Sequence, residues 1–212
     1  KTNLSSPMRN GEFFRALARA ELLTLTPICP EVDLLRLSIP RNPVKMVAGD
    51  INAASGCGDV QLLDAATGLP IPEWERRLRG ANDEAALSAL AREKYGTDAC
   101  TSAYPVCGFI GRSRSPSCGV GSGRVYPQSG DIATYLSGSG VYAAHLERRA
   151  TASVDTAGKE PPVVMVNHRG ISQRLPSEGS GAVHVESLDD FLGRCWDRHL
   201  WLLKTAPQNT ER

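Results

Sequence analysis

The residues of this chain best suited to chemistry lie between Gly111 and Arg124. This stretch reads GRSRSPSCGVGSGR and places one thiol, Cys118, among serines and glycines, with Arg112 and Arg114 nearby. Arginines beside a thiol would lower its pKa and attract an anion, and glycines let the backbone approach a ligand closely. A surface turn rich in small residues would explain the stretch equally well. A phosphate-binding loop has weaker support, because the lysine and the spacing of a P-loop are missing.

A second candidate group lies in ICPEV, where Cys29 and Glu31 flank a proline. We expect both this segment and the Cys118 segment to be loops that follow strands, which is where reactive side chains concentrate. A carboxylate close to a metal-binding thiol would suit a general base acting on water. Alone, the pair is only suggestive.

The other four cysteines carry less chemical information. Cys195 falls in the apolar stripe of the last helix and Cys107 in an apolar strand, so we expect both to be buried structural thiols. The spacing of Cys100 and Cys107 matches no compact metal knuckle. Cys57, in SGCGD, is expected in an exposed turn, where it would either bind a metal or simply be tolerated.

Helices and strands alternate along the chain. Apolar spacing predicts helices in GEFFRALARAEL, over residues 73–94, after the candidate N-cap Ser139, and near the C-terminus. Strands are expected in LTLT, VQLLD, YPVCGFIG and PPVVMVNH. The alternation favours an α/β fold, a single compact layered domain with a mostly parallel sheet flanked by helices. In the last helix the predicted apolar stripe consists of Leu188, Phe191, Leu192, Cys195, Trp196, His199, Leu200 and Leu203.

Length and composition bound the class of protein. We divide the 212 residues into an α/β domain over 1–150 and a C-terminal extension over 151–212, a strand plus an amphipathic helix that packs on the same domain. A hydrophobic content of 41% without a long apolar run argues against a membrane protein, and a net charge of +1 argues against nucleic-acid binding through global charge. No segment resembles a signal peptide, so we expect a cytoplasmic protein.

Several blocks taken together are more specific than any one of them. ICPEV, SIPRNPVKMV, GRSRSPSCG, GRVYP and GSGVYAAHLERR occur in this order between about Leu4 and Arg149. In this combination the chain resembles the 2-thiouracil desulfidase family. The resemblance implies a compact α/β domain that holds a [4Fe-4S] cluster on three cysteines. It leaves one iron of the cluster open to the sulfur of a thiolated pyrimidine.

The resemblance also implies roles for individual residues. Cys29 and Cys118 would be cluster ligands, Glu31 would activate water, and Ser115 would hydrogen-bond or relay a proton at the reacting group. Ser117 is an alternative for the serine role, and Arg41 would position substrate or brace the loop. Sulfur would leave as sulfide, and the product would be the oxo-pyrimidine.

The third cysteine of the family pattern is missing at its expected place. The family has it near the N-terminus, before an Arg-x-Asn/Asp-Gly stretch, whereas NLSSPMRNGE has the flanks without the cysteine. Three explanations remain open. A segment that carried it between Ser6 and Pro7 is absent from this sequence, Cys57 supplies the thiolate, or the cluster has been lost.

The sequence leaves several functions in play. The leading hypothesis is a desulfidase for a small thiolated pyrimidine or nucleoside, namely 2-thiouracil, 4-thiouracil or 4-thiouridine. A tRNA substrate is an alternative, although the residues after Thr151 form no aromatic and basic stripe. A cluster-free thiol transferase with Cys118 as nucleophile, or a binding module that docks through its last helix, also remains. The oligomeric state is not indicated.

Overall fold

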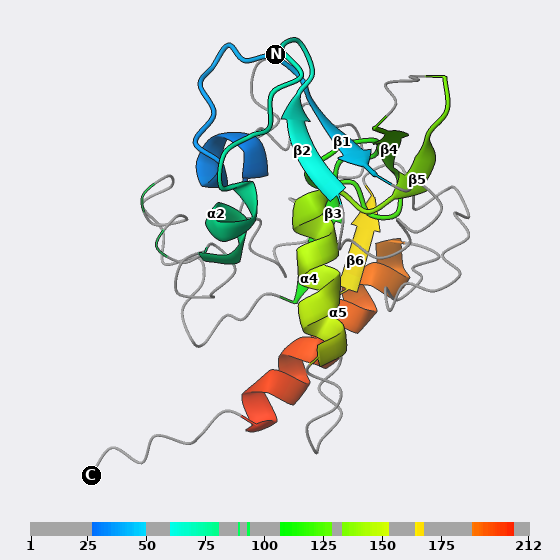
Figure 1. Cartoon of the computed structure of the whole chain (residues 1–212). Coiled ribbons are helices and arrows are strands. Elements are labelled where there is room, and N and C mark those ends of the chain that lie inside the picture. The colour runs from blue at the N-terminus through cyan, green and yellow to red at the C-terminus, as the bar shows by residue number, and fades with distance from the viewer. Residues whose placement is uncertain are drawn as a thin grey trace.

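The structure is a computed structural model that describes residues 27–49, 60–80, 107–128, 133–152, 164–167 and 188–205, together with Ala89 and Glu93. Figure 1 shows how these elements are arranged. In chain order they are a π-helix η2 (Pro30–Leu34), β1 (Val44–Ala48), β2 (Val60–Asp64), α2 (Trp74–Gly80), β3 (Gly108–Gly111), β4 (Gly123–Pro127), β5 (Leu136–Gly138), α4 (Val141–Ala152), β6 (Val164–Asn167) and α5 (Leu188–Thr205). The helix and strand expected between residues 11 and 26 lie outside the described residues.

The strands form two sheets. A 4-stranded sheet has the order β2-β1-β4-β5, and a 2-stranded sheet joins β3 to β6. Strand β1 pairs with β2 antiparallel and with β4 parallel, and β4 pairs with β5 antiparallel. Strands β3 and β6 are parallel.

The α/β class is confirmed, but the expectation of a mostly parallel sheet is wrong for the larger sheet. Only its β1–β4 pairing is parallel, and the other two pairings are antiparallel. Residues 49–59 join β1 to β2, and residues 128–135 join β4 to β5. A parallel crossover needs about a dozen residues or more, so connections this short favour antiparallel neighbours.

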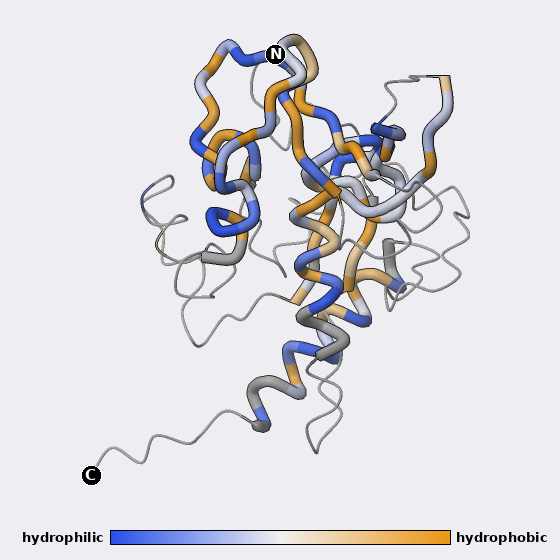
Figure 2. Tube along the Cα trace, viewed as in Figure 1, coloured by the Kyte–Doolittle hydropathy of each residue, from blue (hydrophilic) through white to orange (hydrophobic). Residues whose placement is uncertain are grey.

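Apolar side chains of the larger sheet, α2 and α4, together with Leu35 after η2 and Ile71 before α2, form the main core. Its largest fully buried members are Tyr142, Leu35, Met46, Leu62 and Leu78. Along β2, Val60 and Leu62 are buried while Gln61 between them is exposed, as expected for a strand with one face on the core. Figure 2 shows apolar residues along β2 and β6 and mixed apolar and polar residues along α4.

Helix α5 packs on the smaller sheet through a second apolar cluster. Phe191 and Cys195 are buried there against Val164 and Val166 of β6, and Cys107 is partly buried beside them. The prediction of a buried thiol is confirmed for Cys195, whereas Cys107 is only partly buried and stands just before β3. β6 belongs to the segment that we separated as a C-terminal extension, and it pairs with β3. The division of the chain at residue 150 stays a prediction.

The predicted apolar stripe of α5 is wider than the face that the helix buries. Trp196 is 50% exposed and Leu200 36% exposed, whereas Arg198 is 6% exposed. Residues 191, 195 and 198 stand four and three positions apart and lie in one row along the helix, so this row faces the sheet. Apolar spacing alone did not identify a buried arginine in that row.

Two further helix predictions concern α2 and the start of α4. The helix predicted over 73–94 begins at Trp74 and is described as far as Gly80, with Ala89 and Glu93 also helical. The prediction that Ser139 caps α4 is wrong, because the first N–H groups of α4 bind loop carbonyls instead. Within the described part of the chain, no helix has the length and hydrophobicity needed to cross a membrane.

Replacing Gly108 by alanine tests the contact between α5 and β3. A Cβ atom at Gly108 would lie 2.7 Å from Cys195 Sγ and 2.8 Å from Phe191 Cζ, both in the second cluster. We expect Gly108→Ala to lower the free energy of unfolding by about 1–3 kcal/mol, measured by urea denaturation.

Gly193→Ala is the matched control, because a Cβ atom there meets no heavy atom within 4 Å and the residue lies inside α5. It should raise the free energy of unfolding by about 0.5–1 kcal/mol. Equal effects of the two substitutions would contradict the close packing of α5 on β3.

Candidate active site

The Cys118 loop follows β3, as predicted, and rests on the N-terminus of α4. Gly140 N donates to Gly119 O (2.7 Å), Val141 N to Pro116 O (2.9 Å) and Tyr142 N to Ser117 O (2.8 Å). The first N–H groups of a helix have no partner within the helix. Because the loop carbonyls fill this role, the helix terminus fixes the backbone on which Ser117 and Cys118 stand.

Two glycines make this close approach of loop and helix feasible. A Cβ atom at Gly140 would lie 2.5 Å from the carbonyl carbon of Ser117, and one at Gly111 would lie 1.9 Å from Cys118 O. Such distances are far inside van der Waals contact, so any side chain would displace the loop. The glycines of the GRSRSPSCG and GSGVY blocks therefore position the Cys118 backbone.

Ser115 organises the tip of the loop. Its Oγ accepts hydrogen bonds from Ser117 N and Cys118 N, each at 3.2 Å, and lies 3.2 Å from Cys118 Sγ. The neutral thiol donates to Ser115 Oγ, and once the thiol has lost its proton the hydroxyl can turn its own hydrogen toward the sulfur. Ser115, which is 9% exposed, can thus stabilise negative charge on Cys118.

The π-helix η2 positions Cys29 and Glu31. Cys29 precedes its first residue, and Pro30 starts it. Cys29 N donates to Asp33 Oδ2 at 2.6 Å, while Cys29 O accepts from Val32 N and Asp33 N. The sequence predicted a loop at this position, and the structure shows a helical turn held by the buried Asp33.

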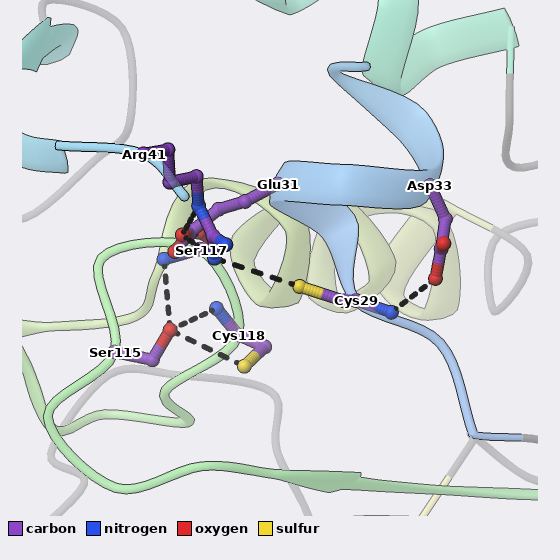
Figure 3. A network of polar contacts seen from close by, with 7 residues as sticks. All are labelled: Cys29, Glu31, Asp33, Arg41, Ser115, Ser117 and Cys118. Atoms are coloured by element: carbon purple, nitrogen blue, oxygen red, sulfur yellow. Dashed lines mark hydrogen bonds and ion pairs between the residues drawn. The ribbon is translucent and has the colours of Figure 1, made fainter. Parts of the chain in front are cut away.

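Glu31 joins the two halves of the site. Its Oε1 accepts from Ser117 Oγ at 2.6 Å, and its Oε2 accepts from Arg41 Nε at 2.9 Å and also contacts Arg41 Nη2. Arg41 Nη2 lies 3.7 Å from Cys29 Sγ as well. Figure 3 shows this network running from Cys29 through Arg41 and Glu31 to the Ser115–Cys118 loop.

The structure therefore brings together all six residues singled out in the sequence: Cys29, Glu31, Arg41, Ser115, Ser117 and Cys118. The catalytic and binding roles of these six residues stay predictions. Sequence analysis missed Asp33. Asp33 stands four residues after Cys29, a spacing at which its carboxylate can accept from Cys29 N if the segment is helical. This spacing was the signal in the sequence that could have identified Asp33.

The electrostatics of Cys118 differ from those expected. Burial raises the pKa of its thiol, and the charges of Glu31 and Cys29 raise it further, against the hydrogen bonds from Ser115 and the Arg112 backbone. We expected the guanidinium groups of Arg112 and Arg114 to lower this pKa. The expectation is wrong, because burial outweighs the opposing hydrogen bonds.

Arg41 is the cation of the site. Burial acts to lower its pKa, but hydrogen bonds and charge interactions with Glu31 and Cys29 raise that pKa above its ordinary value. Arg41 therefore stays charged and balances the carboxylate. Arg41 Nη2 thereby links the Glu31 carboxylate to the sulfur of Cys29.

Two thiols alone do not complete a metal site. Among the described residues, no group of three or more His, Cys, Asp or Glu side chains is arranged to hold a metal ion. Cys57 and Cys100 lie outside the described residues, as does Ser6, which the sequence joins directly to Pro7. Cys29 and Cys118, both partly buried beside one polar network, are donors of the soft type found in iron–sulfur sites.

The fold and the site define an α/β protein in which a helical turn with Cys29 and Glu31 meets a loop with Ser115, Ser117 and Cys118 at the N-terminus of α4. A family model described as 2-thiouracil desulfurase matches residues 9–156. The chain belongs to the 2-thiouracil desulfurase family. Neither the curated proteins nor the solved structures gave a match.

Removal of the Ser115 hydroxyl tests its role at Cys118. Because the hydrogen bond from Ser115 lowers the pKa of the thiol, Ser115→Ala should raise that pKa further. Less thiolate then forms at a given pH, so alkylation of the peptide containing Cys118 should slow and its pH profile should shift upward. The rate is measured by mass spectrometry on protein free of iron.

Ser122→Ala provides the control within the same loop, because Ser122 Oγ accepts from Arg114 N. Its alkylation profile should match that of the wild type. An unchanged profile in Ser115→Ala would show that the Ser115 hydroxyl does not stabilise the Cys118 thiolate.

Proposed function

We propose that this protein is a hydrolytic desulfidase that converts a thiolated pyrimidine and water into the oxo-pyrimidine and hydrogen sulfide. The observation that carries the proposal is the Cys29–Arg41–Glu31–Ser117 network beside Cys118, in a chain of the 2-thiouracil desulfurase family. The substrate class comprises 2-thiouracil, 4-thiouracil and 4-thiouridine.

Cys29 and Cys118 would be two of the ligands of a [4Fe-4S] cluster. The third would come either from a segment absent between Ser6 and Pro7 or from Cys57. When bound, the cluster would supply an iron that is soft enough to attract the substrate sulfur. Burial raises the pKa of Cys118, which disfavours a free thiolate nucleophile at neutral pH. A neutral thiol is a poor nucleophile, whereas coordination to a metal removes its proton outright.

Glu31 would act as the general base. Its carboxylate takes a proton from a water molecule as the water oxygen bonds to the carbon that carries sulfur. The C–S bond then breaks, the sulfur keeps the bonding electrons, and it leaves as sulfide. No net oxidation or reduction is needed, because water supplies the oxygen and both hydrogens.

Arg41 and the two serines would hold these groups in place. Arg41 and Ser117 bind different oxygens of Glu31 and so fix the plane of its carboxylate. Ser117 is only 1% exposed, which suits a residue that positions Glu31 rather than one that touches substrate. Ser115, next to Cys118 Sγ, is the serine better placed to donate to sulfur.

Iron content tests the cluster assignment. Protein purified and reconstituted without oxygen should contain iron and acid-labile sulfide and absorb visible light. Cys118→Ala should lose most of the iron and the absorbance, because one thiolate ligand is removed. Cys107→Ala is the control, since Cys107 packs in the second apolar cluster, and it should keep its iron. A wild-type protein that takes up no iron would contradict the proposal.

Activity of a Glu31 variant tests the general base. Glu31→Gln should keep its iron but lose about 10²–10⁴-fold in kcat for sulfide release from 4-thiouracil, because the amide cannot accept the proton. Glu75→Gln is the control, because it removes an exposed carboxylate on α2. This variant should retain full activity. Full activity in Glu31→Gln would assign the base to another group.

A further inference from the structure

The hydroxyl of Ser139, which the sequence marked as a cap for α4, has two other partners. Ser139 Oγ accepts a hydrogen bond from Gly121 N at 2.8 Å and donates one to Glu147 Oε1 at 2.7 Å. Gly121 belongs to the loop that carries Cys118, whereas Glu147 stands about two turns into α4. The hydroxyl therefore connects the middle of α4 to the Cys118 loop. The proposed attack of water uses none of these three residues.

The chemistry of the groups fixes the direction of both hydrogen bonds. A backbone N–H only donates, so the Ser139 oxygen must accept from Gly121. The single hydrogen of the hydroxyl then points to Glu147, because an ionised carboxylate only accepts. Burial raises the pKa of Glu147, while the hydrogen bond from Ser139 lowers it and so favours the ionised form. Hydrogen bonds to a charged acceptor are stronger than those between neutral groups.

Gly121 lies where the chain leaves the Cys118 loop and turns toward β4. Its φ of +58° is in the left-handed region, and a Cβ atom there would meet no heavy atom within 4 Å. The turn therefore needs glycine for its backbone conformation and not for close packing. Because packing does not hold this exposed residue, its hydrogen bond to Ser139 matters for the position of the turn.

The chain after Cys118 is held at two points by the segment that leads into α4. Gly140 N donates to Gly119 O at 2.7 Å, and Ser139 Oγ accepts from Gly121 N two residues further along. The first contact joins backbone to backbone. The second depends on the orientation of a hydroxyl group, which the hydrogen bond to Glu147 sets. Glu147 thus influences the Cys118 loop without lying in it.

We propose that Glu147, acting through Ser139, is a positioning residue that keeps the chain after Cys118 against the N-terminus of α4. Its effect is on the backbone of the loop. Without this hold the loop opens more often, and the partly buried Cys118 is exposed to solvent for a larger fraction of the time. The importance of this hold for desulfuration rests on the proposed function, whereas its effect on access to Cys118 does not.

Alkylation of iron-free protein, resolved by residue with mass spectrometry, tests the proposal. Glu147→Ala and Ser139→Ala should each speed alkylation of Cys118 about 3–10-fold, because each removes a hydrogen bond that closes the loop. The double variant should react no faster than the faster single variant, since the two residues act in series. Alkylation of Cys195, buried under α5, should not change, which separates local opening from a general loss of stability.

A conservative variant and two controls complete the comparison. In Glu147→Gln the amide oxygen can still accept from Ser139, so alkylation of Cys118 should return close to the wild-type rate. Ser137→Ala and Arg148→Ala are the matched controls, because both side chains are exposed, the first on β5 and the second on α4. Both should leave the alkylation of Cys118 unchanged.

Iron release extends the test to the loaded protein. Glu147→Ala should lose iron to a chelator about 3–10-fold faster than the wild type, because the loop that carries one ligand opens more often. Ser137→Ala should lose iron at the wild-type rate.

The outcomes separate the positioning role from the proposed function. If Glu147→Ala speeds alkylation of Cys118 but wild-type protein takes up no iron, the positioning role stands and the proposed function fails. The positioning role is overturned if alkylation of Cys118 is unchanged in Glu147→Ala, or if Cys195 reacts faster by the same factor. It is also overturned if Glu147→Gln reacts as fast as Glu147→Ala.

Discussion

The hydrogen bond from Ser117 Oγ to Glu31 Oε1 joins two segments that lie 86 positions apart in the chain. Each segment is anchored separately, the first by the turn of η2 and the second by the N-terminus of α4. Because Ser117 is buried, this bond forms where water competes little, and Arg41 completes it by pairing with the other carboxylate oxygen. The relative position of Cys29 and Cys118 depends on it.

The site is held more by backbone than by side chains. Loop carbonyls bind the first N–H groups of α4, and glycines at 111 and 140 bring loop and helix into contact. A backbone fixed in this way sets the positions from which the side chains of Ser115, Ser117 and Cys118 make their contacts. It also explains why the stretch has small residues but no apolar periodicity, since its packing uses main-chain atoms.

Local sequence patterns predicted individual helices and strands better than they predicted how the strands pair. Strands β2, β3 and β6 and helices α4 and α5 appear where short apolar runs, a helix-start signal or helical spacing indicated them, because such patterns reflect which residues are buried. The sheet order did not follow, since strand pairing depends on contacts between distant segments that a local pattern does not encode. The site residues were recognisable as motifs, yet the contact of Arg41 with both Glu31 and Cys29 required the tertiary structure.

The pairing of β6 with β3 has a consequence for the chain beyond the family match, which ends at residue 156. Strand β3 ends at Gly111, where the Cys118 loop starts, and within the described residues β6 is its strand partner. A chain without residues 164–167 would leave β3 with a bare edge of unpaired N–H and C=O groups, a template for aggregation. Through β6, the C-terminal segment therefore covers one edge of the strand that leads into the Cys118 loop.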